Sequence, residues 1–193
     1  KHIHFDVETD GFYGAYWACK DGSDCAVIAM IGDDPEDYMA RSAVKWLLRL
    51  GVNGLTKSPG KKHYGHHNYP LECIEKAIAW LKLHGNEKIG IAGASTTGTL
   101  ALTAASLFDN ISLTIAMTPS DFVWQGFMQG KKDGCKEWPS EGESLFSYKG
   151  KPFPYMPFRY QHPDYWRKIS EESKRTGNMV ASRKLFDDSE AAY

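Results

Sequence analysis

The chain has 193 residues, of which 42% are hydrophobic and 24% charged, and its 23 basic and 24 acidic side chains give a formal net charge of −1. This length is enough for one well-buried core, and the balanced charge excludes a nucleic-acid or anionic-membrane partner held by bulk charge. No apolar run approaches the roughly 20 residues that span a bilayer, and no signal-peptide pattern follows the first residues.

The first part of the chain predicts paired strands, then a buried strand and a helix. Residues 2–17 contain an Asp10-Gly11 turn, which favours two strands joined as a hairpin. The continuous apolar run at 25–31 is typical of a strand buried on both faces. Capping acids at 33–37 precede a helix over 38–50 with an apolar stripe. Its members recur at helical spacing: Met39, Ala43, Trp46, Leu47 and Leu50.

The same alternation continues to residue 117. A short strand at 52–55 and a polar loop at 56–69 lead into a helix from Pro70 to near Gly85. Beyond it, strands are expected at 88–92 and 111–117, on either side of a small-residue helix at 98–108. Several of these strands lack polar alternation, as strands of a covered parallel sheet do. Residues 1–120 therefore predict an α/β fold with a mostly parallel sheet and helices on both faces.

Residues 121–193 have a different character. They are rich in aromatic residues, proline, lysine and glutamate, and no buried-strand run is evident. Four prolines in 148–163 predict an ordered loop, and 165–179 is typical of an amphipathic helix. An insertion after a sheet strand can cover the carboxyl ends of the strands, where open α/β sheets bind ligands. We therefore expect 121–193 to form a cap.

The segment KIGIAGASTTG at 88–98 carries the most specific chemical signal. It places Gly93-Ala94-Ser95 between a predicted strand and a predicted helix, which is the layout of a nucleophile elbow. A helix N-terminus favours an oxyanion, so the pattern predicts Ser95 as nucleophile and the Thr96 N–H as an oxyanion donor. Alternatively, both residues only cap the helix. Position 97 holds threonine where Gly-x-Ser-x-Gly has glycine, and the glycine follows at 98.

Three segments together resemble a known family. GAS with Gly98, TPSDFVWQG at 118–126 and HNYPLE at 67–72 are similar to the acyl-CoA thioester hydrolase and bile-acid-CoA:amino acid N-acyltransferase C-terminal domain family, particularly to its dienelactone-hydrolase-like bacterial members. The resemblance covers roughly residues 1–190. It implies an α/β-hydrolase fold and acyl transfer from an ester or thioester to water or an amine. It also implies Ser95 at the nucleophile position, where serine suits hydrolysis.

The resemblance further implies a second oxyanion donor in the loop after the third strand. Here this is the Asp33 N–H, with Gly32 next, although this loop is not the glycine-rich one of the family. Asp33 can instead cap the following helix, and both roles can coexist.

The acid and histidine that follow the nucleophile in this fold are not assignable. His162, which lies in the expected cap, does not match the family's spacing. We therefore expect a fragment lacking the last two strands, with a second chain or strand-exchanged partner completing the sheet. A catalytic histidine and acid would then lie outside this sequence.

Two further groups of residues invite a binding role. Trp124 follows the strand nearest the elbow, which makes it the best candidate to line a substrate pocket. A second group in one loop is a positive lip for phosphates, a metal site or, in the simplest interpretation, a solvated loop: Lys57, Lys61, Lys62, His63, His66 and His67.

The sequence predicts a serine hydrolase of small acyl esters or thioesters. No metal is expected, and no nucleotide cofactor, because the glycine-rich phosphate-binding motifs are missing. Four scattered cysteines favour reduced thiols and a cytoplasmic location. The alternatives are an amino-acid N-acyltransferase, a peptidase, or an inactive scaffold that binds partners.

Overall fold

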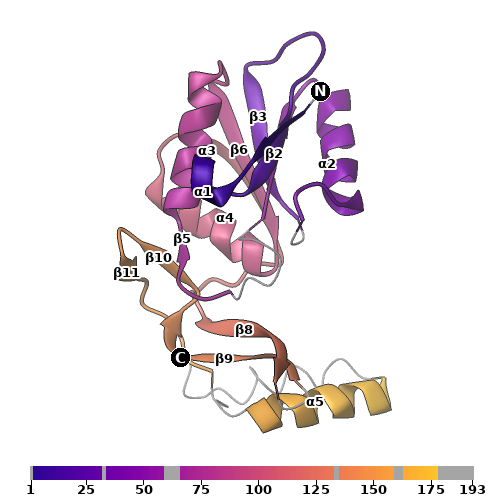
Figure 1. The fold of residues 1–193 in the computed structure, drawn as a ribbon, viewed down its shortest axis with the longest axis vertical. Helices are drawn as coiled ribbons and strands as arrows, with labels where there is room; N and C mark the ends of the chain where they lie inside the picture. Colours follow the sequence, from indigo (N-terminus) through magenta and orange to yellow (C-terminus); the bar gives the residue numbers. More distant parts are fainter. Residues whose placement is uncertain (1, 32–33, 59–65, 133–134, 159–162, 178–193) are drawn as a thin grey trace. The chain divides into compact units, whose positions relative to one another are not determined.

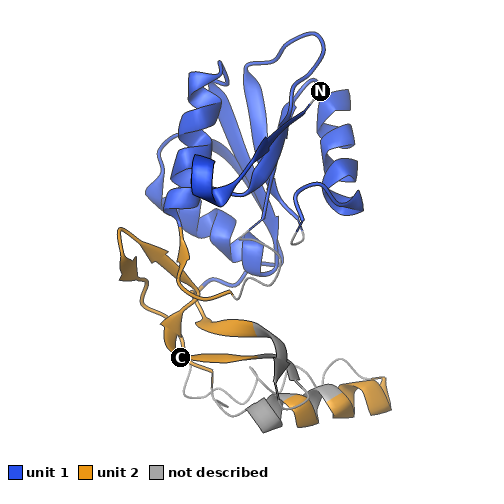
Figure 2. Ribbon diagram, viewed as in Figure 1, with its two compact units in different colours: residues 1–62, 71–121 blue, residues 63–70, 122–193 orange. Residues whose placement is uncertain are grey.

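The computed structural model describes residues 2–31, 34–58, 66–132, 135–158 and 163–177. The chain forms two compact units (Figure 2). Unit 1 comprises residues 1–62 and 71–121, and unit 2 comprises residues 63–70 and 122–193. Unit 1 is a sheet flanked by helices, and unit 2 is built largely from β-hairpins (Figure 1).

The sheet of unit 1 has six strands in the order β1-β2-β4-β3-β6-β7. The strands are β1 (His2–Phe5), β2 (Gly14–Trp17), β3 (Cys25–Met30), β4 (Asn53–Lys57), β6 (Lys88–Ala94) and β7 (Ile111–Met117). β2 pairs antiparallel with both β1 and β4, whereas β4, β3, β6 and β7 run parallel. The α/β prediction is confirmed, and so are the strands expected at 25–31, 88–92 and 111–117.

Four helices accompany this sheet: α1 (Val7–Asp10), α2 (Tyr38–Arg49), α3 (Glu72–Leu83) and α4 (Thr96–Leu107). A Cβ built at Gly54 would lie 3.2 Å from Val44 of α2, and one at Gly93 would lie 2.0 Å from the Thr97 carbonyl oxygen of α4. Gly54 of β4 pairs with Val27 of β3, and Val27 pairs with Gly90 of β6, which lies three residues before Gly93. Side chains alternate along a strand, so Gly54 and Gly93 face opposite sides. Helices therefore cover both faces, as predicted.

Helix α2 begins as expected but buries a different stripe. The Asp37 carboxylate caps it by accepting a 2.7 Å hydrogen bond from the Ala40 amide. Leu47 of the predicted stripe is buried, together with Ala40 and Val44. The other large members of that stripe are each 59% exposed: Met39, Trp46 and Leu50. The apolar residues of α2 form two adjacent rows, and only the row at positions 40, 44 and 47 faces the sheet.

Other element boundaries needed correction. The loop predicted at 56–69 was wrong at its start, because β4 continues through Thr56 and Lys57, both 1% exposed. α3 begins at Glu72 rather than at Pro70, which belongs to strand β5 (Tyr69–Pro70). The turn expected at residues 10–11 is preceded by α1, which ends at Gly11 with a φ of 77°.

Unit 2 contains strands that the sequence pattern did not reveal. β8 (Gln125–Lys132) and β9 (Cys135–Ser144) form an antiparallel hairpin. β10 (Phe146–Tyr148) and β11 (Lys151–Pro152) form a second hairpin inside part of the predicted loop. Its two turn residues, Lys149 and Gly150, both have positive φ, as in a type I′ turn. β10 also pairs in parallel with β5.

Helix α5 (Pro163–Thr176) lies in unit 2, where a helix over 165–179 was predicted, and it packs against β9. Residues 178 and 179 lie outside the described part of the chain. Within the described ranges, no helix has the length and apolar character needed to cross a membrane.

Candidate active site

The turn between β6 and α4 carries Ser95. The residue has φ 54° and ψ −122°, a backbone conformation that side-chain-bearing residues rarely adopt. The strand ends at Ala94 and the helix starts at Thr96, so one residue makes the whole change of direction. Ser95 is exposed. Sequence and structure agree on a strand–Ser95–helix layout in which the side chain at position 95 is accessible.

Glycine at positions 93 and 98 is required by close approaches of the backbone. A Cβ at Gly93 would lie 2.0 Å from the Thr97 carbonyl oxygen, which is far closer than any real contact. At Gly98 it would lie 2.9 Å from the Met117 carbonyl oxygen at the end of β7. The first turn of α4 therefore passes directly over the strand that precedes it and beside the end of the next strand.

Neighbouring strands hold the turn on both sides. The Ser95 amide donates a 2.9 Å hydrogen bond to the Met117 carbonyl at the end of β7. On the other side, the Thr97 hydroxyl lies 3.1 Å from the Met30 carbonyl at the end of β3. The carboxyl ends of three parallel strands thus meet around Ser95, where ligands bind in open α/β sheets.

A second hydroxyl pair holds the segment that follows β7. Thr99, which is 3% exposed, accepts a 3.0 Å hydrogen bond from the Ser120 amide through its Oγ1. Its Oγ1 also lies 3.1 Å from the Ser120 hydroxyl oxygen. Between them, Thr118 has a φ of 46°. Sequence reasoning missed the pairing of Thr99 with Ser120, because a threonine and a serine 21 residues apart give no pattern that reveals it.

The N-terminus of α4 offers backbone donors beside Ser95. The Ser95 side chain makes no cap hydrogen bond, and the first intrahelical bond runs from the Thr99 amide to the Ser95 carbonyl, 3.1 Å apart. The amides of the first turn, including that of Thr96, therefore have no intrahelical acceptor. Together with the helix dipole, they can stabilise negative charge that develops next to Ser95.

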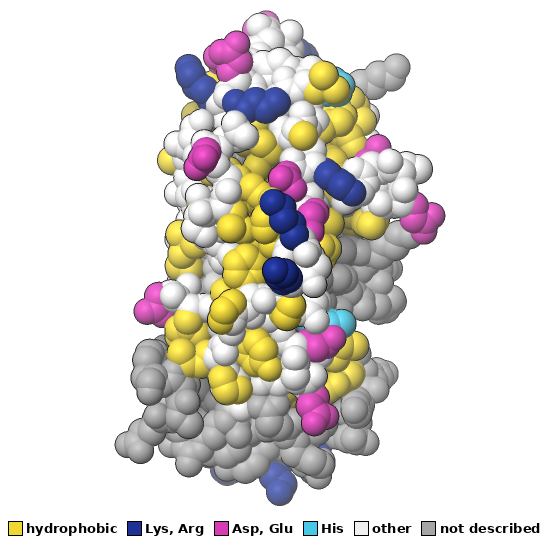
Figure 3. All heavy atoms as spheres, turned by 90° about the vertical axis from the view of Figure 1, so that its left-hand side faces the viewer, with side chains coloured by type: hydrophobic (Ala, Val, Ile, Leu, Met, Phe, Trp, Pro, Cys, Tyr) yellow, Lys and Arg dark blue, Asp and Glu magenta, His cyan; other side chains and the backbone are white. Residues whose placement is uncertain are grey.

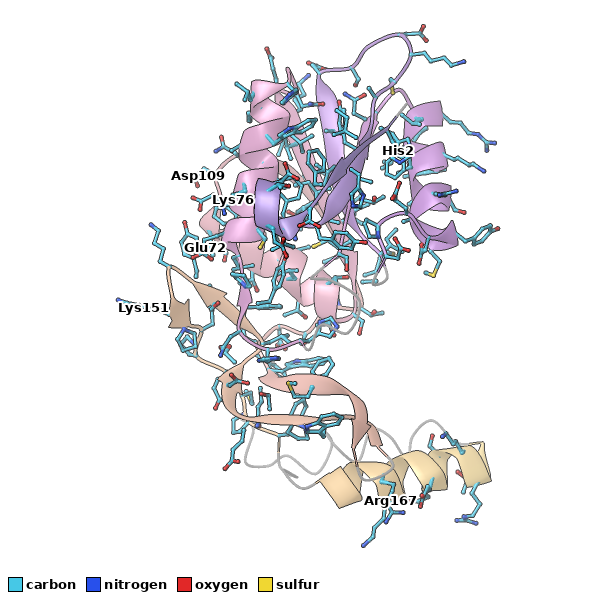
Figure 4. All side chains as sticks on the ribbon, viewed as in Figure 1. His2, Glu72, Lys76, Asp109, Lys151 and Arg167 are labelled. Atoms are coloured by element: carbon cyan, nitrogen blue, oxygen red, sulfur yellow. The ribbon has the colours of Figure 1, made fainter. Side chains whose placement is uncertain are left out.

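No base or acid for Ser95 emerges from the described residues. Within them, the Ser95 hydroxyl has no hydrogen-bond partner, and the histidines of unit 1 are engaged elsewhere. His2 and His4 on the edge strand β1 both contact the Glu36 carboxylate, with His4 Nδ1 at 3.3 Å (Figure 4 labels His2). His84 follows α3 and stacks on a tryptophan of that helix. His162 lies outside the described residues.

The remaining predicted site residues have varied outcomes. Gly32 and Asp33 lie outside the described residues, so their oxyanion role stays a prediction. Trp124 belongs to unit 2 and Ser95 to unit 1. The Trp124 ring meets that of Phe158 edge-to-face at 6.5 Å, and its role in substrate binding also stays a prediction.

Three residues of the basic group, Lys57, His66 and His67, lie in the described part of the chain. Lys57 is buried in β4 rather than exposed in a loop. His67 Nδ1 lies 3.0 Å from a carboxylate oxygen of Glu143, and His66 stacks on a phenylalanine of β8. Residues 61–63 lie outside the described part of the chain. Among the residues that are described, no group of three or more His, Cys, Asp or Glu side chains is arranged to hold a metal ion.

Lys57 is a buried cation, although the sequence pattern predicted that it lies in a polar loop. Burial lowers the pKa of its ammonium group to about 8, and nearby Cys73 raises it by a smaller amount. Lys57 is in register with Met30, which is in register with Gly93. These positions share one face of the sheet, which is the face that α4 covers.

Two segments that carry the family resemblance meet in unit 2. The backbone N–H of Asn68 donates a 2.6 Å hydrogen bond to the Ser144 carbonyl. A Cβ at Gly126 would lie 2.7 Å from the His67 Cβ, so the close approach of HNYPLE to TPSDFVWQG requires glycine there. Their co-occurrence in the sequence therefore has a packing cause.

Gln125 is the buried polar centre of this unit. It is 2% exposed, and its Nε2 donates a 2.9 Å hydrogen bond to the Ser140 carbonyl. Its Oε1 accepts a 2.9 Å hydrogen bond from the Phe158 amide. One side chain thus joins β8, β9 and the segment before α5.

A cavity of about 550 Å³ lies elsewhere on unit 1. It is lined by Glu75, Ile78, Ala79, Lys82, Leu83, Phe108 and Asn110. Phe108 and Asn110 lie between the end of α4 and the start of β7, whereas Ser95 lies at the opposite ends of these elements. Figure 3 shows hydrophobic side chains on this side of unit 1, interspersed with lysines and acidic residues. This cavity is therefore not a pocket at Ser95.

Comparison with known proteins gives one matching family model and several similar solved structures. Residues 69–162 match the family described as "BAAT / Acyl-CoA thioester hydrolase C terminal". Similar solved structures include Est1E from Butyrivibrio proteoclasticus, with 21% identity, a TM-score of 0.47 and coverage of 61% of this chain and 51% of that one. An esterase of Pyrococcus furiosus has 22% identity and a TM-score of 0.48, with coverage of 62% of this chain and 48% of that one. The α/β hydrolase GrgF from Penicillium sp. sh18 has 18% identity and a TM-score of 0.49, with coverage of 65% of this chain and 47% of that one.

The chain spans about half the length of these solved structures. A search of curated proteins gave no match.

Proposed function

We propose that the chain, whose residues 69–162 match the BAAT / acyl-CoA thioester hydrolase C-terminal family, is an α/β hydrolase that hydrolyses acyl esters or acyl-CoA-type thioesters with Ser95 as nucleophile. The conformation of Ser95 carries the proposal. A serine with positive φ between a strand and a helix costs folding energy, and such strain is characteristic of functional turns.

In the proposed reaction, the Ser95 hydroxyl attacks the acyl carbonyl carbon while a general base removes its proton. The carbonyl oxygen becomes an oxyanion, which the Thr96 N–H and the positive end of α4 stabilise. Expulsion of the alkoxide or thiolate leaves an acyl-serine, and water then releases the acid. The mechanism requires a histidine and an acid in addition to Ser95.

A thioester is favoured over a carboxylic ester by the family description alone, which names acyl-CoA thioester hydrolases. An amine as acceptor is the alternative within this chemistry. We propose water, because the acyl-enzyme of a serine is readily hydrolysed and the exposure of Ser95 gives water access.

The test is the intact mass of the full chain before and after a fluorophosphonate probe. The proposal expects one adduct, absent from Ser95→Ala and retained in Ser106→Ala. Ser106 is a matched control because it lies on the same helix, where its hydroxyl donates to the Thr103 carbonyl at 2.7 Å. Probe-reactive protein is then given acyl-CoA, with the freed thiol measured in the presence and absence of an amino-acid acceptor.

Each outcome discriminates. Thiol release without an amide product supports hydrolysis, and amide formation supports acyl transfer instead. Absence of an adduct with the wild-type chain would contradict the proposal and favour the inactive scaffold.

A further inference from the structure

Position 97 departs from the usual elbow pattern, and the structure gives the threonine there a specific task. The Thr97 hydroxyl lies near three backbone groups that belong to two strands. It accepts a 3.0 Å hydrogen bond from the Ala94 amide. It can donate to the Met30 carbonyl at 3.1 Å or to the Ala94 carbonyl at 2.9 Å.

This arrangement extends the β3–β6 ladder by one rung. The register of these parallel strands ends with Met30 opposite Gly93, so Ala94 lies one residue beyond the last paired position. The Thr97 hydroxyl stands between the Ala94 amide and the Met30 carbonyl, and it can accept from one and donate to the other. The bridge thus joins the end of β3 to the residue immediately before Ser95.

We propose that Thr97 is a positioning residue, whose hydroxyl holds the Ser95 turn against the carboxyl end of β3. The proposal rests on the proposed role of Ser95 as nucleophile. The opposite side of the turn is already held, because the Ser95 amide bonds to the Met117 carbonyl. Thr97 supplies the matching restraint, so the hydroxyl of Ser95 and the amide of Thr96 keep a constant geometry.

The effect falls on reactivity more than on folding. Ala94 is exposed and Thr97 is half-buried, so water can replace hydrogen bonds that the substitution removes. A water molecule is not covalently attached to the first turn of α4, as the Thr97 hydroxyl is, so it does not hold that turn against β3. A displaced reacting group costs a factor of about 10 to 100 in rate.

Three substitutions separate the hydroxyl from the shape of the side chain. Thr97→Val keeps the shape and removes the hydroxyl, Thr97→Ser keeps the hydroxyl, and Thr97→Gly restores the usual motif while removing both. Thr103→Val is the matched control, since its hydroxyl donates to the Thr99 carbonyl at 2.9 Å within the same helix and away from the turn.

The readouts are the rate of fluorophosphonate labelling and the kcat and KM for an activated acetyl ester, measured on the full chain. We expect Thr97→Val and Thr97→Gly to slow labelling and lower kcat at least about 10-fold with little change in KM. Thr97→Ser and Thr103→Val should stay close to wild type. Wild-type rates in Thr97→Val, or an equal loss in Thr103→Val, would overturn the inference.

A second measurement keeps this inference separate from the proposed function. Hydrogen exchange at the Ala94 amide reports the bridge directly, and we expect it to be faster in Thr97→Val and Thr97→Gly than in wild type and Thr97→Ser. If wild-type protein forms no adduct, the proposed function fails and exchange alone decides about the bridge. Equal exchange in all four proteins would overturn the bridge even in a reactive enzyme.

Discussion

The Ser95 amide and the Met117 carbonyl oxygen lie 2.9 Å apart, so the last residue of β7 holds the turn that follows β6. This bond helps to keep Ser95 at a φ of 54°, a value that glycine adopts without cost and serine does not. The surrounding backbone therefore imposes a conformation that the side chain opposes. An alternative in which Ser95 merely caps α4 does not account for this, because its side chain makes no cap hydrogen bond.

Replacing Ser95 by glycine tests this strain. We expect Ser95→Gly to raise the free energy of unfolding by about 1 kcal/mol and to abolish probe labelling, because glycine removes both the strain and the proposed nucleophile. Ser95→Ala should also abolish labelling while leaving stability near that of wild type. Denaturant unfolding of the three proteins measures the difference, and a Ser95→Gly protein less stable than Ser95→Ala would show that the turn is unstrained.

Gly93 and Gly90 lie in the same strand and give a matched pair. Gly93→Ala places a Cβ 2.0 Å from a backbone oxygen of α4, whereas Gly90→Ala places one 3.2 Å from the Val27 Cγ2, where a side chain can adjust. We expect Gly93→Ala to destabilise the chain by about 3 kcal/mol or more and Gly90→Ala by about 1 kcal/mol or less. Thermal unfolding compares them. A loss in Gly93→Ala as small as that expected for Gly90→Ala would mean that α4 can move off the strand at little cost.

The sequence was most informative where one local rule acted alone. Ile111–Met117 has no charge or glycine, and its strand was predicted to the residue. The strand–Ser95–helix turn was predictable because Gly93 and Gly98, within three residues of Ser95, each meet a steric need. By contrast, α2 carries two apolar rows, and choosing between them requires knowing where the sheet lies.

Unit 2 was harder to predict for a physical reason. β8 and β9 bury polar groups such as Gln125, whose partners, the Ser140 carbonyl and Phe158 amide, lie 15 and 33 residues away. Such strands lack the continuous apolar run that marks β3. From the sequence, Thr97 was visible only as a departure from the usual glycine at this position. Its hydrogen bond to the Met30 carbonyl could not be predicted, because Met30 lies far away in the sequence.

Gln125→Met tests the buried centre of unit 2. The substitution keeps the size of the side chain but leaves the Ser140 carbonyl and the Phe158 amide without their bonds to Gln125. Leaving two buried polar groups unsatisfied costs about 2 to 4 kcal/mol. We expect hydrogen exchange in β8 and β9 to quicken while that in β3 and β6 stays unchanged. An unchanged exchange pattern throughout would show that water satisfies these groups.

Lys57→Met tests the cost of a buried ammonium group. Burial lowers the pKa of Lys57 from 10.5 to about 8 in the folded chain, so the folded state binds this proton less tightly than the unfolded state does. Below pH 8 both states hold the proton, and the folded state bears the full cost of about 3 kcal/mol. Between pH 8 and 10.5 the folded chain has released a proton that the unfolded chain retains, so stability rises with pH.

We therefore expect Lys57→Met to raise the free energy of unfolding at pH 7 by up to about 3 kcal/mol and to remove the rise between pH 8 and 10.5. Lys88→Met is the control, because Lys88 has a 68% exposed side chain and should leave the pH profile unchanged. Urea unfolding at pH 7, 8, 9 and 10 measures both profiles. A Lys57→Met protein that is less stable than wild type at pH 7 would contradict this expectation. It would mean that interactions within the fold stabilise the Lys57 ammonium group by more than its burial costs.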